Sequence, residues 1–461
     1  MSFDFTVPVV IAGAGAAGLA AALAARDAGA DVLVLEQDAS PAGTTSMSQG
    51  NICAAGTAAQ GAAGVEDSPE LLFADIMAKT RGLTDPVLAR AIADAAGPTV
   101  DAMVQRWDMP WELDLKFKAG FGHSVRRIHS WLGRGGADMV QLFAARAEAA
   151  GADILTGARL VEIHGDGSGR ATGVRIARPD GSTEDIGCDA LILATCGFAA
   201  NAGMVAAHIP EAAHAMTHTH AGNDGAGIRL GAALGGALAD MAAYQGYGML
   251  TVGYGITTPP SVLIEGGYVV NQTGKRFCHE LEDISGMVRH TLAQPDGLAF
   301  VIYDDAIADA CGYIPEMAQF ADLNAARTAD TLEGLAAAIG VPADALAATH
   351  ADALAAASGA PDPFGRLWTT GAPPSGPFRA LKVTGALYHT QGGLQVGPDA
   401  RVLRDTGAML PNLFAAGGTA RGVSGPGAWG YLPAMGLASA VTLGRLAGSA
   451  AAALTSGSPR V

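Results

Sequence analysis

Gly13, Gly15 and Gly18 form a G-x-G-x-x-G motif, and an acidic residue, Glu36, follows it. The motif lies between an apolar run and an Ala-rich stretch, where a strand would pass into a helix. Gly13 permits a tight turn, Gly15 lets a pyrophosphate approach the backbone, and Gly18 brings helix and strand together. Glu36 ends a second apolar run and can accept hydrogen bonds from a ribose hydroxyl. The spacing therefore predicts a dinucleotide site near the start of the chain.

The composition excludes several classes of protein. Hydrophobic residues make up 49% of the 461 residues and charged residues only 16%, so the chain has too much apolar surface and too few charges to stay disordered. The formal net charge is -16 and Lys and Arg form no cluster, which argues against a nucleic-acid partner. The length corresponds to about three domain-sized units.

The cysteines and the N-terminus indicate the cellular compartment. The five cysteines are odd in number and none forms a CxxC pair, so we expect reduced, mostly buried thiols and no metal site. The N-terminus has no basic segment before its apolar run, and no apolar stretch reaches the ~18 uninterrupted residues of a membrane-spanning helix. We therefore expect a cytoplasmic protein without an integral membrane segment.

Hydrophobic periodicity predicts the elements that position the glycine motif. Residues 7–12 and 32–36 are short apolar runs typical of buried parallel strands, and the Ala-rich stretch up to residue 28 predicts the helix between them. Residues 40–63 are rich in Gly, Ser, Thr and Ala, which predicts a loop packed closely on a ligand or on backbone. Helical spacing predicts further helices over residues 68–106 and 137–150.

Strand-like patterns return later in the chain. Residues 158–190 alternate apolar and polar residues between Gly-rich turns, which predicts an antiparallel meander. Residues 190–195 predict another buried strand, as do residues 413–418, and a helix is predicted over residues 433–454.

The predicted fold class is α/β with one interruption. Residues 1–235 form the first part of a Rossmann-like domain, with a parallel sheet plus an antiparallel meander, and residues 375–461 complete it. Residues 236–374 contain more Tyr, Met, Asp and Pro, and they predict an inserted α+β domain.

Four segments resemble the flavoproteins of the fumarate reductase/succinate dehydrogenase superfamily. Residues 41–57 (PAGTTSMSQGNICAAGT) are similar to the family's Gly/Ser-rich flavin loop, and residues 190–198 (ALILATCGF) to its ATGGF strand. Residues 389–393 (HTQGG) resemble its HTxGG segment beside the isoalloxazine ring, and residues 413–418 (LFAAGG) its closing LFAAGE motif. The resemblance covers nearly the whole chain and implies FAD as the cofactor, with the inserted domain as a cap over it.

The resemblance also implies which residues bind FAD: Gly13, Gly15, Ala16, Ala17, Gly18, Glu36, Gln37, Thr44, Thr45, Ser46, Ser48, Gly50, Ala194, Thr195, Gly197, Gly392, Gly417, Gly418, Gly427 and Leu432. Two positions depart from the family, because Cys196 replaces the second residue of TGG and Gly418 replaces an acid that contacts the FAD ribitol in relatives. Respiratory members attach FAD to a histidine in the flavin loop. Residues 41–57 contain no histidine, so we expect non-covalent FAD.

Members of this superfamily add or remove two hydrogens across a carbon–carbon bond next to a carbonyl or carboxylate, one as a hydride at flavin N5 and one as a proton. Fumarate reductases carry three charge-recognition residues that this chain lacks. Tyr247 replaces their QxHPT histidine, Ile284 replaces their proton-donating arginine, and residues 424–436 contain no arginine. A dicarboxylate needs cationic partners, so the sequence argues against fumarate as the substrate.

Residues 425–435 (GPGAWGYLPAM) instead resemble the 3-ketosteroid Δ1-dehydrogenase branch, whose GPGxxxGPAM segment polarises a ketone oxygen. Gly427 matches the glycine of that branch, Val423 stands where the branch has a tyrosine, and Tyr431 is a candidate substitute. A polarised carbonyl acidifies the neighbouring C–H and stabilises the enolate. The resemblance therefore implies a FAD-dependent enzyme that desaturates a cyclic ketone next to its carbonyl, or that catalyses the reverse ene reduction.

The candidates for the proton-transferring group lie in or near the inserted domain: Tyr247, Tyr254, Tyr268 and His279. Tyr247 leads because of its position in the QxHPT-like segment. His389 is expected beside the flavin, in contact with the substrate or the ring. An ordinary packing role stays open for each of these residues.

Two other functions stay open. The first is reduction of an unsaturated acid, as in fumarate or urocanate reductases, and its substrate would need an arginine in the pocket: Arg126, Arg127, Arg289 or Arg421. The second is flavin binding without catalysis. Because the sequence has no CxxCH haem motif and no second dinucleotide motif, we expect a separate electron donor or acceptor.

Overall fold

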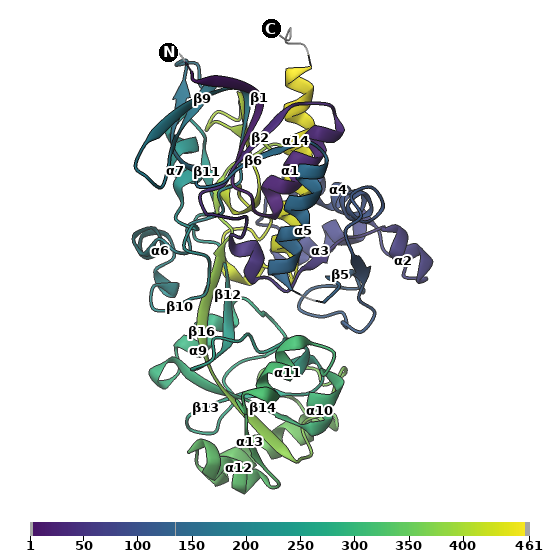
Figure 1. Ribbon diagram of the computed structural model, residues 1–461. Coiled ribbons are helices and arrows are strands. Elements are labelled where there is room, and N and C mark those ends of the chain that lie inside the picture. Colours follow the sequence, from purple (N-terminus) through teal and green to yellow (C-terminus); the bar gives the residue numbers. More distant parts are fainter. Residues whose placement is uncertain (1–2, 134, 457–461) are drawn as a thin grey trace.

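The computed structural model describes residues 3–133 and 135–456, and it has two lobes (Figure 1). The first lobe holds the first and the last described residues, and the second lies below it in this view. Two paired strands, β12 (Tyr244–Thr251) and β16 (Phe378–Thr390), run from one lobe into the other. The predicted α/β class is confirmed, since each lobe combines helices with its own sheet.

A largely parallel sheet forms the centre of the first lobe. In spatial order its main path consists of β18 (Arg401–Leu403), β19 (Met409–Ala415), β9 (Thr183–Leu193), β1 (Phe5–Ala12), β2 (Val32–Leu35) and β6 (Asp153–Leu155). β1 pairs in parallel with β2 on one side and with β9 on the other. Val9, Val10 and Ile11 of β1 are fully buried, because a central parallel strand is covered on both faces.

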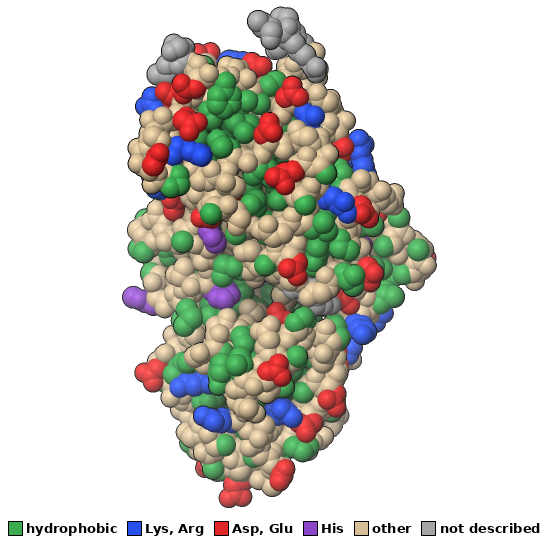
Figure 2. Space-filling view, viewed as in Figure 1, with side chains coloured by type: hydrophobic (Ala, Val, Ile, Leu, Met, Phe, Trp, Pro, Cys, Tyr) green, Lys and Arg blue, Asp and Glu red, His purple; other side chains and the backbone are tan. Residues whose placement is uncertain are grey.

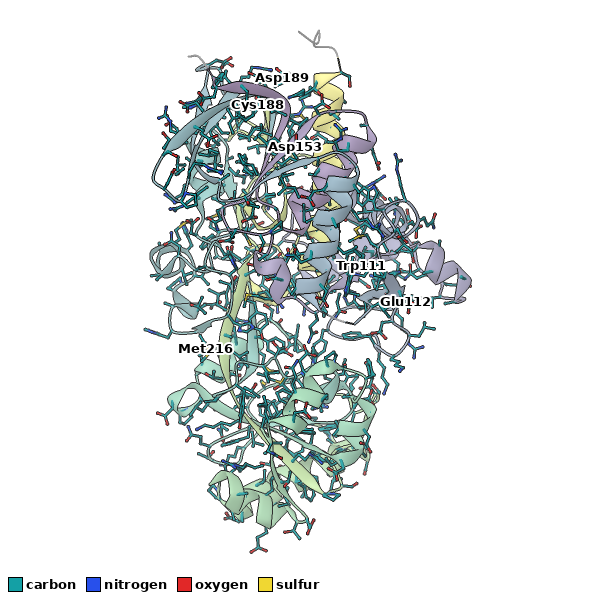
Figure 3. All side chains as sticks on the ribbon, in the orientation of Figure 1. Trp111, Glu112, Asp153, Cys188, Asp189 and Met216 are labelled. Atoms are coloured by element: carbon teal, nitrogen blue, oxygen red, sulfur yellow. The ribbon has the colours of Figure 1, made fainter. Side chains whose placement is uncertain are left out.

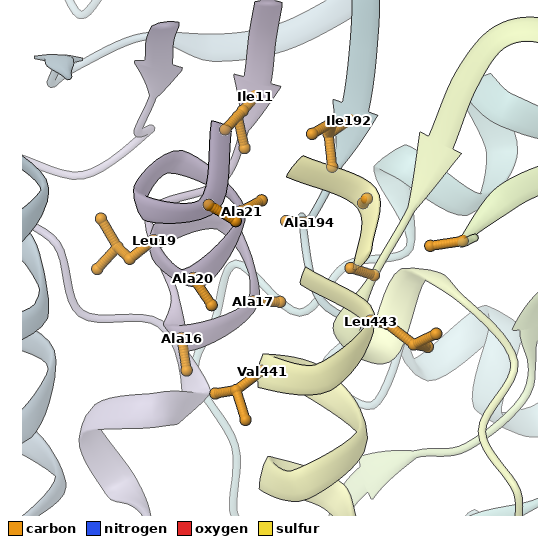
Figure 4. Packing of buried hydrophobic residues seen from close by; sticks show 14 of the residues in the cluster. Ile11, Ala16, Ala17, Leu19, Ala20, Ala21, Ile192, Ala194, Val441 and Leu443 are labelled. Carbon is orange, nitrogen blue, oxygen red and sulfur yellow. The ribbon is translucent and has the colours of Figure 1, made fainter. Parts of the chain in front are cut away.

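Helices α1 (Ala16–Asp27) and α14 (Met435–Thr455) pack side by side through small residues. Figure 4 shows the alanines of α1 beside α14. A methyl group on Gly444 would overlap the carbonyl oxygen of Ala17, and one on Gly448 would overlap that of Ala21. These two contacts show that the helices run parallel. Along their common direction, α14 begins about two turns before α1.

Helix α14 is also long and apolar enough to span a membrane, judged by length and composition alone. Its most apolar window has a mean hydropathy of 1.4, but 56% of that window is buried inside the protein. Because α14 packs against α1 and the central sheet, its apolar residues are those of a core helix.

The predicted antiparallel meander consists of β7 (Arg159–Gly165), β8 (Ala171–Ala177) and β9. The sequence separated the last strand of the meander from the buried strand over residues 190–195. The structure joins them, since β9 is one strand of 11 residues. It pairs antiparallel with β8 on one edge and parallel with β1 and β19, so one continuous strand serves both parts of the sheet.

The segment predicted as a loop over residues 40–63 contains short regular elements. They are a 3-10 turn, η1 (Thr44–Met47), the strand β3 (Asn51–Cys53) and the helix α2 (Ala58–Ala62). Helix α2 begins at a capping box, in which the side chain and backbone of Thr57 bond reciprocally with Gln60.

The helical stretch predicted over residues 68–106 is in fact two helices, α3 (Pro69–Lys79) and α4 (Pro86–Gln105). The chain turns between them, where Gly82 has a positive φ of 72°. Asp85 caps α4, because its side chain accepts the N–H groups of the first helical turn.

The remaining elements of the first lobe surround its sheet. Trp111, labelled in Figure 3, packs edge-on against Trp131 with 4.8 Å between ring centroids, and it also contacts Phe143. These aromatic contacts join a small three-stranded sheet, made by β3 with two further strands, to helix α5. The bounds are β4 (Trp111–Leu113), β5 (Ile128–Trp131), α5 (Gly136–Ala149), α6 (Ala202–His208), α7 (Ala226–Ala233), β11 (Leu238–Ala239) and β17 (Gly393–Leu394).

The second lobe is built around β16. This strand pairs with β10 (Met216–Thr217), β12, β14 (Leu298–Asp304) and β15 (Arg327–Ala329), and β13 (Tyr268–Asn271) pairs with β14. The helices are α8 (Ser261–Ile264), α9 (Met287–Leu292), α10 (Asp305–Ala310), α11 (Pro315–Asp322), α12 (Leu332–Ile339) and α13 (Ala343–Ala357). The insert proposed over residues 236–374 covers most of this lobe, whereas β16 follows it in sequence.

The contact between α1 and α14 predicts the effect of adding one methyl group. In most helices Gly→Ala stabilises the protein, but Gly448→Ala is expected to lower the free energy of unfolding by about 1–3 kcal/mol, because the new methyl overlaps a carbonyl group. Ser449→Ala on the exposed side of the same helix is the control, with a change within about 0.5 kcal/mol. Urea denaturation measures both, and a gain in stability for Gly448→Ala would refute the close packing.

Candidate active site

A cavity of about 870 Å³ lies at the carboxyl ends of β1, β2 and β9, where the sequence predicts the dinucleotide site. Gly13, Glu36 and Ala194, which follow those three strands, all line it. In open parallel sheets, ligands bind in the crevice at this edge. We name this space the dinucleotide cavity.

The glycine motif leaves the cavity open to a phosphate group. A Cβ on Gly13 would overlap the carbonyl oxygen of Ala194, and Gly13 has a φ of 106°, which glycine adopts without strain. Gly15, Ala16 and Ala17 line the cavity at the start of α1. A helix N-terminus supplies N–H groups and positive charge to a pyrophosphate, so these residues fit the phosphates of FAD.

Glu36 also lines the dinucleotide cavity, and hydrogen bonds fix its carboxylate there. Its carboxylate accepts the N–H groups of Ala14 at 2.9 Å and Asp38 at 3.0 Å, and the residue is 5% exposed. Burial raises the pKa of Glu36, and the two N–H bonds oppose that rise. Because each carboxylate oxygen can accept more than one hydrogen bond, Glu36 fits the hydroxyl groups of a ribose.

The flavin loop closes on the start of α1. The N–H of Ala16 donates to Thr45 Oγ1 at 3.0 Å. Ser46 and Ser48 donate to carbonyl oxygens within their own turn, those of Gly43 and Thr45, at 2.9 and 2.8 Å. The threonine therefore faces the cavity, whereas the two serines hold the turn.

The residues that the resemblance assigns to FAD fall into two groups. Those that line the dinucleotide cavity are Gly13, Gly15, Ala16, Ala17, Glu36, Gln37, Thr44, Thr45, Ala194, Thr195, Gly417 and Gly418. Those outside its lining, among the described residues, are Gly18, Ser46, Ser48, Gly50, Gly197, Gly392, Gly427 and Leu432. Two glycines of the second group are closely packed, since a Cβ on Gly197 would overlap Thr390 Oγ1 and one on Gly392 would overlap the carbonyl of Asp240.

The two departures from the family pattern lie in contact with each other. Cys196 lines the cavity with a φ of 66°, and its Sγ lies 3.5 Å from Thr44 Oγ1. A Cβ on Gly418 would press against the backbone of Cys196 and Gly197. In this chain the backbone therefore occupies the position at which an acidic side chain would have to start.

The sequence did not reveal a loop that closes one side of the dinucleotide cavity. His220, Gly222, Asn223 and Asp224 line it, just before α7. Asn223 is fully buried, and its Oδ1 accepts the N–H of Ala199 at 3.3 Å. The signal was present as a Gly-Asn-Asp-Gly turn ahead of a helix, a composition that fits both a surface loop and a ligand loop.

A second cavity of about 1010 Å³ lies between the two lobes and shares Thr44 with the first. Its lining is aromatic, apolar or neutral-polar: Thr44, Met47, Ser48, Gln49, Asn51, Phe117, Ile128, His218, Gln245, Tyr247, Thr257, Pro260, Ile284, Tyr388, His389, Tyr431, Pro433, Ala434 and Leu437. No Asp, Glu, Lys or Arg of the described chain lines it. We name this space the substrate cavity.

The arginines that a carboxylate substrate would need lie elsewhere. Arg127 is fully buried between two aspartates, at 2.8 and 3.0 Å. Arg421 is paired with two other aspartates, one at 3.1 Å. Arg126 and Arg289 line separate surface hollows. Figure 2 shows acidic and basic side chains scattered over the face in view. The described lining of the substrate cavity contains neither kind.

The structure separates the four candidates for the proton-transferring group. Tyr247 lines the substrate cavity, and its hydroxyl donates to the carbonyl of Thr258. Tyr254 is 44% exposed on the second lobe, Tyr268 is buried inside that lobe, and His279 lies outside the cavity lining. The sequence missed Tyr388, whose ring stacks on Tyr247 with 5.3 Å between centroids.

His389 and Tyr431 lie together on one wall of the substrate cavity. Their rings meet edge to face with 5.7 Å between centroids, and the Tyr431 hydroxyl accepts the N–H of Gly436 at 3.2 Å. Burial lowers the pKa of His389 to about 4, so its imidazole is neutral at pH 7. A neutral imidazole carries one N–H and can donate one hydrogen bond to a ligand.

Gly427, which the sequence assigned to the ketone oxygen, is not among the described residues that line the cavity. It caps a 3-10 turn, and a Cβ there would press on the indole of Trp429. The segment that does line the cavity comes later, at Tyr431, Pro433 and Ala434, where α14 begins. The assignment of Gly427 to the ketone oxygen stays a prediction, and the cavity lining adds residues of the same segment to it.

Comparison with known proteins decides the family. The model of a family described as FAD binding domain matches residues 8–430. The chain belongs to this FAD-binding family. The flavoprotein is 32% identical over 451 residues to a fumarate reductase (cytochrome) of Shewanella frigidimarina, covering 97% of this chain and 77% of that protein. FAD is therefore its cofactor, and its chemistry is that of an oxidoreductase acting on a CH–CH bond.

Solved structures agree with this assignment. The flavoprotein aligns with the open conformation of a flavocytochrome c3 fumarate reductase at a TM-score of 0.81 and 27% identity, over 99% of this chain and 79% of the other. It also aligns with a 3-ketosteroid-Δ4-(5α)-dehydrogenase of Rhodococcus jostii in complex with 4-androstene-3,17-dione, at a TM-score of 0.77 and 27% identity over 98% of both chains.

The lining of the dinucleotide cavity predicts how FAD is held. The one histidine that lines it, among the described residues, is His220, which lies beside Asp38 at the Glu36 end. The flavin loop has no histidine, so acid precipitation is expected to leave a colourless pellet and a yellow supernatant. Absorbance of the supernatant near the flavin maximum measures release, and colour retained on washed, denatured protein would show a covalent bond.

Proposed function

We propose that the flavoprotein exchanges two hydrogens across the CH–CH bond next to the carbonyl of a neutral cyclic ketone. The uncharged, largely aromatic lining of the substrate cavity carries this proposal. A carboxylate that leaves water needs a cationic partner, whereas a ketone on an apolar ring needs only hydrogen-bond donors. The likeness to a ketosteroid dehydrogenase in complex with a ketone supports the same class of substrate.

His389 is the donor that we assign to the carbonyl oxygen. It is neutral at pH 7, it lines the substrate cavity, and its Nε2 makes no hydrogen bond to the described part of the chain. A donor that is already aimed at a carbonyl oxygen stabilises the negative charge that develops there as an enolate forms. In this role His389 replaces both the glycine N–H and the tyrosine that the sequence suggested.

Tyr247 and Tyr388 are the groups that we assign to the proton on the neighbouring carbon. Burial raises the pKa of both phenols, so both are protonated at neutral pH. The Tyr388 hydroxyl lies 2.5 Å from Thr257 Oγ1, which can return a proton to it. A protonated phenol can serve as the general acid when an enone is reduced, and the same group serves as the base in the reverse desaturation.

Bound FAD supplies the hydride exchange. The substrate cavity meets the dinucleotide cavity at Thr44, so a substrate between His389 and the tyrosines would lie next to the cofactor site. The electrons come from or go to a separate partner. Cytoplasmic location belongs to the same proposal and rests on the sequence alone.

A second candidate function is reduction of an unsaturated carboxylic acid. The 32% identity to a fumarate reductase favours it. The absence of cationic side chains among the described residues of the substrate cavity opposes it, because a buried carboxylate would lack a partner. The two functions differ in the charge of the substrate, which makes them separable by experiment.

A panel of substrates distinguishes the two functions. The flavin is photoreduced without oxygen, ligands are added, and the return of flavin absorbance is followed. Cyclic enones are expected to reoxidise it, while fumarate and urocanate are not, since they carry charges that the cavity cannot pair. Arg126→Ala should leave the enone rate unchanged, because Arg126 is exposed and outside the cavity. Rapid reoxidation by an unsaturated acid but not by enones would establish the second function.

The tyrosine pair predicts a specific loss of rate. Tyr388→Phe keeps the ring that stacks on Tyr247 and removes only the hydroxyl, so FAD binding should persist while the reoxidation rate falls by about 10²–10⁴-fold. Tyr254→Phe, on the exposed surface of the second lobe, is the matched control and should leave the rate unchanged. Equal rates for Tyr388→Phe and the unmodified protein would remove Tyr388 from the mechanism.

A further inference from the structure

His389 is the end of a buried chain of three side chains. Gln391 Nε2 lies 2.9 Å from His389 Nδ1, and Ser424 Oγ lies 3.0 Å from Gln391 Oε1. Gln391 is 6% exposed and Ser424 is 2% exposed. Ser424 donates to the amide oxygen, which leaves the amide nitrogen to face the imidazole. An amide nitrogen only donates hydrogen bonds, so His389 Nδ1 must accept.

Two glycines make room for this arrangement. A Cβ on Gly422 would overlap Gln391 Oε1, and a Cβ on Gly436 would lie 2.8 Å from His389 Nε2. The backbone of Gln391 is fixed as well, because its N–H donates to the carbonyl of Ala243 at 2.8 Å and its own carbonyl accepts the N–H of Gly422 at 2.7 Å. Both the glutamine and the imidazole are therefore held in place.

We infer that Gln391, anchored by Ser424, fixes His389 in the tautomer whose Nε2–H faces the substrate cavity, and that it thereby selects ligands that offer a lone pair. Gln391 lines neither cavity and acts through His389, so it is a positioning residue. A neutral imidazole has one N–H and one lone pair, and the hydrogen bond at one nitrogen decides the state of the other. With Nδ1 accepting, Nε2 can only donate.

The inference rests on the proposed function and narrows its substrate. A carbonyl oxygen accepts hydrogen bonds and never donates one, so it matches Nε2–H and is repelled by an Nε2 lone pair. An alcohol on the same ring can both accept and donate, so it fits either tautomer. The ratio of ketone affinity to alcohol affinity therefore reports the tautomer, whereas a general distortion of the cavity would weaken both ligands together.

Gln391→Met tests the inference, because it keeps a long side chain and removes the donor. The freed Nδ1 can then take the proton and donate to the carbonyl of Thr390, which is 3.4 Å away. In the FAD-loaded protein, the affinity for a saturated cyclic ketone is expected to fall about tenfold while that for its alcohol changes less than about twofold. Titrations that follow the flavin absorbance measure both ligands.

Controls separate this role from a structural one. Gln395→Met makes the same chemical change four residues away, outside both cavities, and should leave the ratio unchanged. Ser424→Ala removes only the anchor and should lower the ratio by a smaller factor, which keeps the inference testable if Gln391→Met does not fold. An equal loss of ketone and alcohol binding in both Gln391→Met and Ser424→Ala would overturn the inference.

A direct measurement does not depend on any ligand. Nitrogen-15 NMR of histidine-labelled protein distinguishes a protonated Nδ1 from a protonated Nε2, and His389→Asn identifies the signal by its loss. The proton is expected on Nε2 in the unmodified protein and on Nδ1 in Gln391→Met. A proton on Nδ1 in the unmodified protein would overturn the inference. If no ketone binds yet the tautomer is as expected, the proposed function fails and the role of Gln391 in positioning the imidazole stands.

Discussion

Around the dinucleotide cavity, glycines allow backbone segments from different elements to be in direct contact. The carbonyl of Ala194 fills the space that a side chain on Gly13 would need, and the carbonyls of Ala17 and Ala21 do the same for Gly444 and Gly448. These contacts fix the ends of the central strands against α1, and α1 against α14. Because α14 begins about two turns before α1, its first residues form part of the substrate cavity. The placement of the second cavity thus depends on glycine contacts around the first.

Charged side chains are absent from the described lining of the substrate cavity. The formal net charge of the whole chain is nevertheless -16. Arg127 and Arg421 are bound by aspartates and are unavailable to a ligand. The polar groups that remain are hydroxyls, amides and imidazoles. Burial keeps His389 neutral and the two stacked phenols protonated, so under the proposed function the cavity would select ligands by hydrogen-bond direction instead of by charge.

Much of the fold could be predicted from the sequence, because the glycine motif and the buried strands are local signals. The segment over residues 40–63 is closely packed as predicted, but its strand β3 forms by pairing with β5, a partner that is distant in sequence and near only in space. Tyr388 was missed, because one tyrosine in a strand carries no sign of which face it presents. The GPGAWGYLPAM segment is a similar case, since a motif gives the segment and only the path of the chain shows that Tyr431, Pro433 and Ala434 line the cavity.

Strand β16 joins tasks that belong to different lobes. Its 13 residues extend over about 43 Å, they pair with the second sheet along most of their length, and His389 is the last residue but one. A long strand of this kind can transmit a rotation of one lobe to the other. If the second lobe swings as a rigid body, its paired strand must carry the imidazole along or bend where the register with β12 shifts, between Gln245 and Gly246. Opening of the lobes would therefore move His389, the group that we propose binds the ketone.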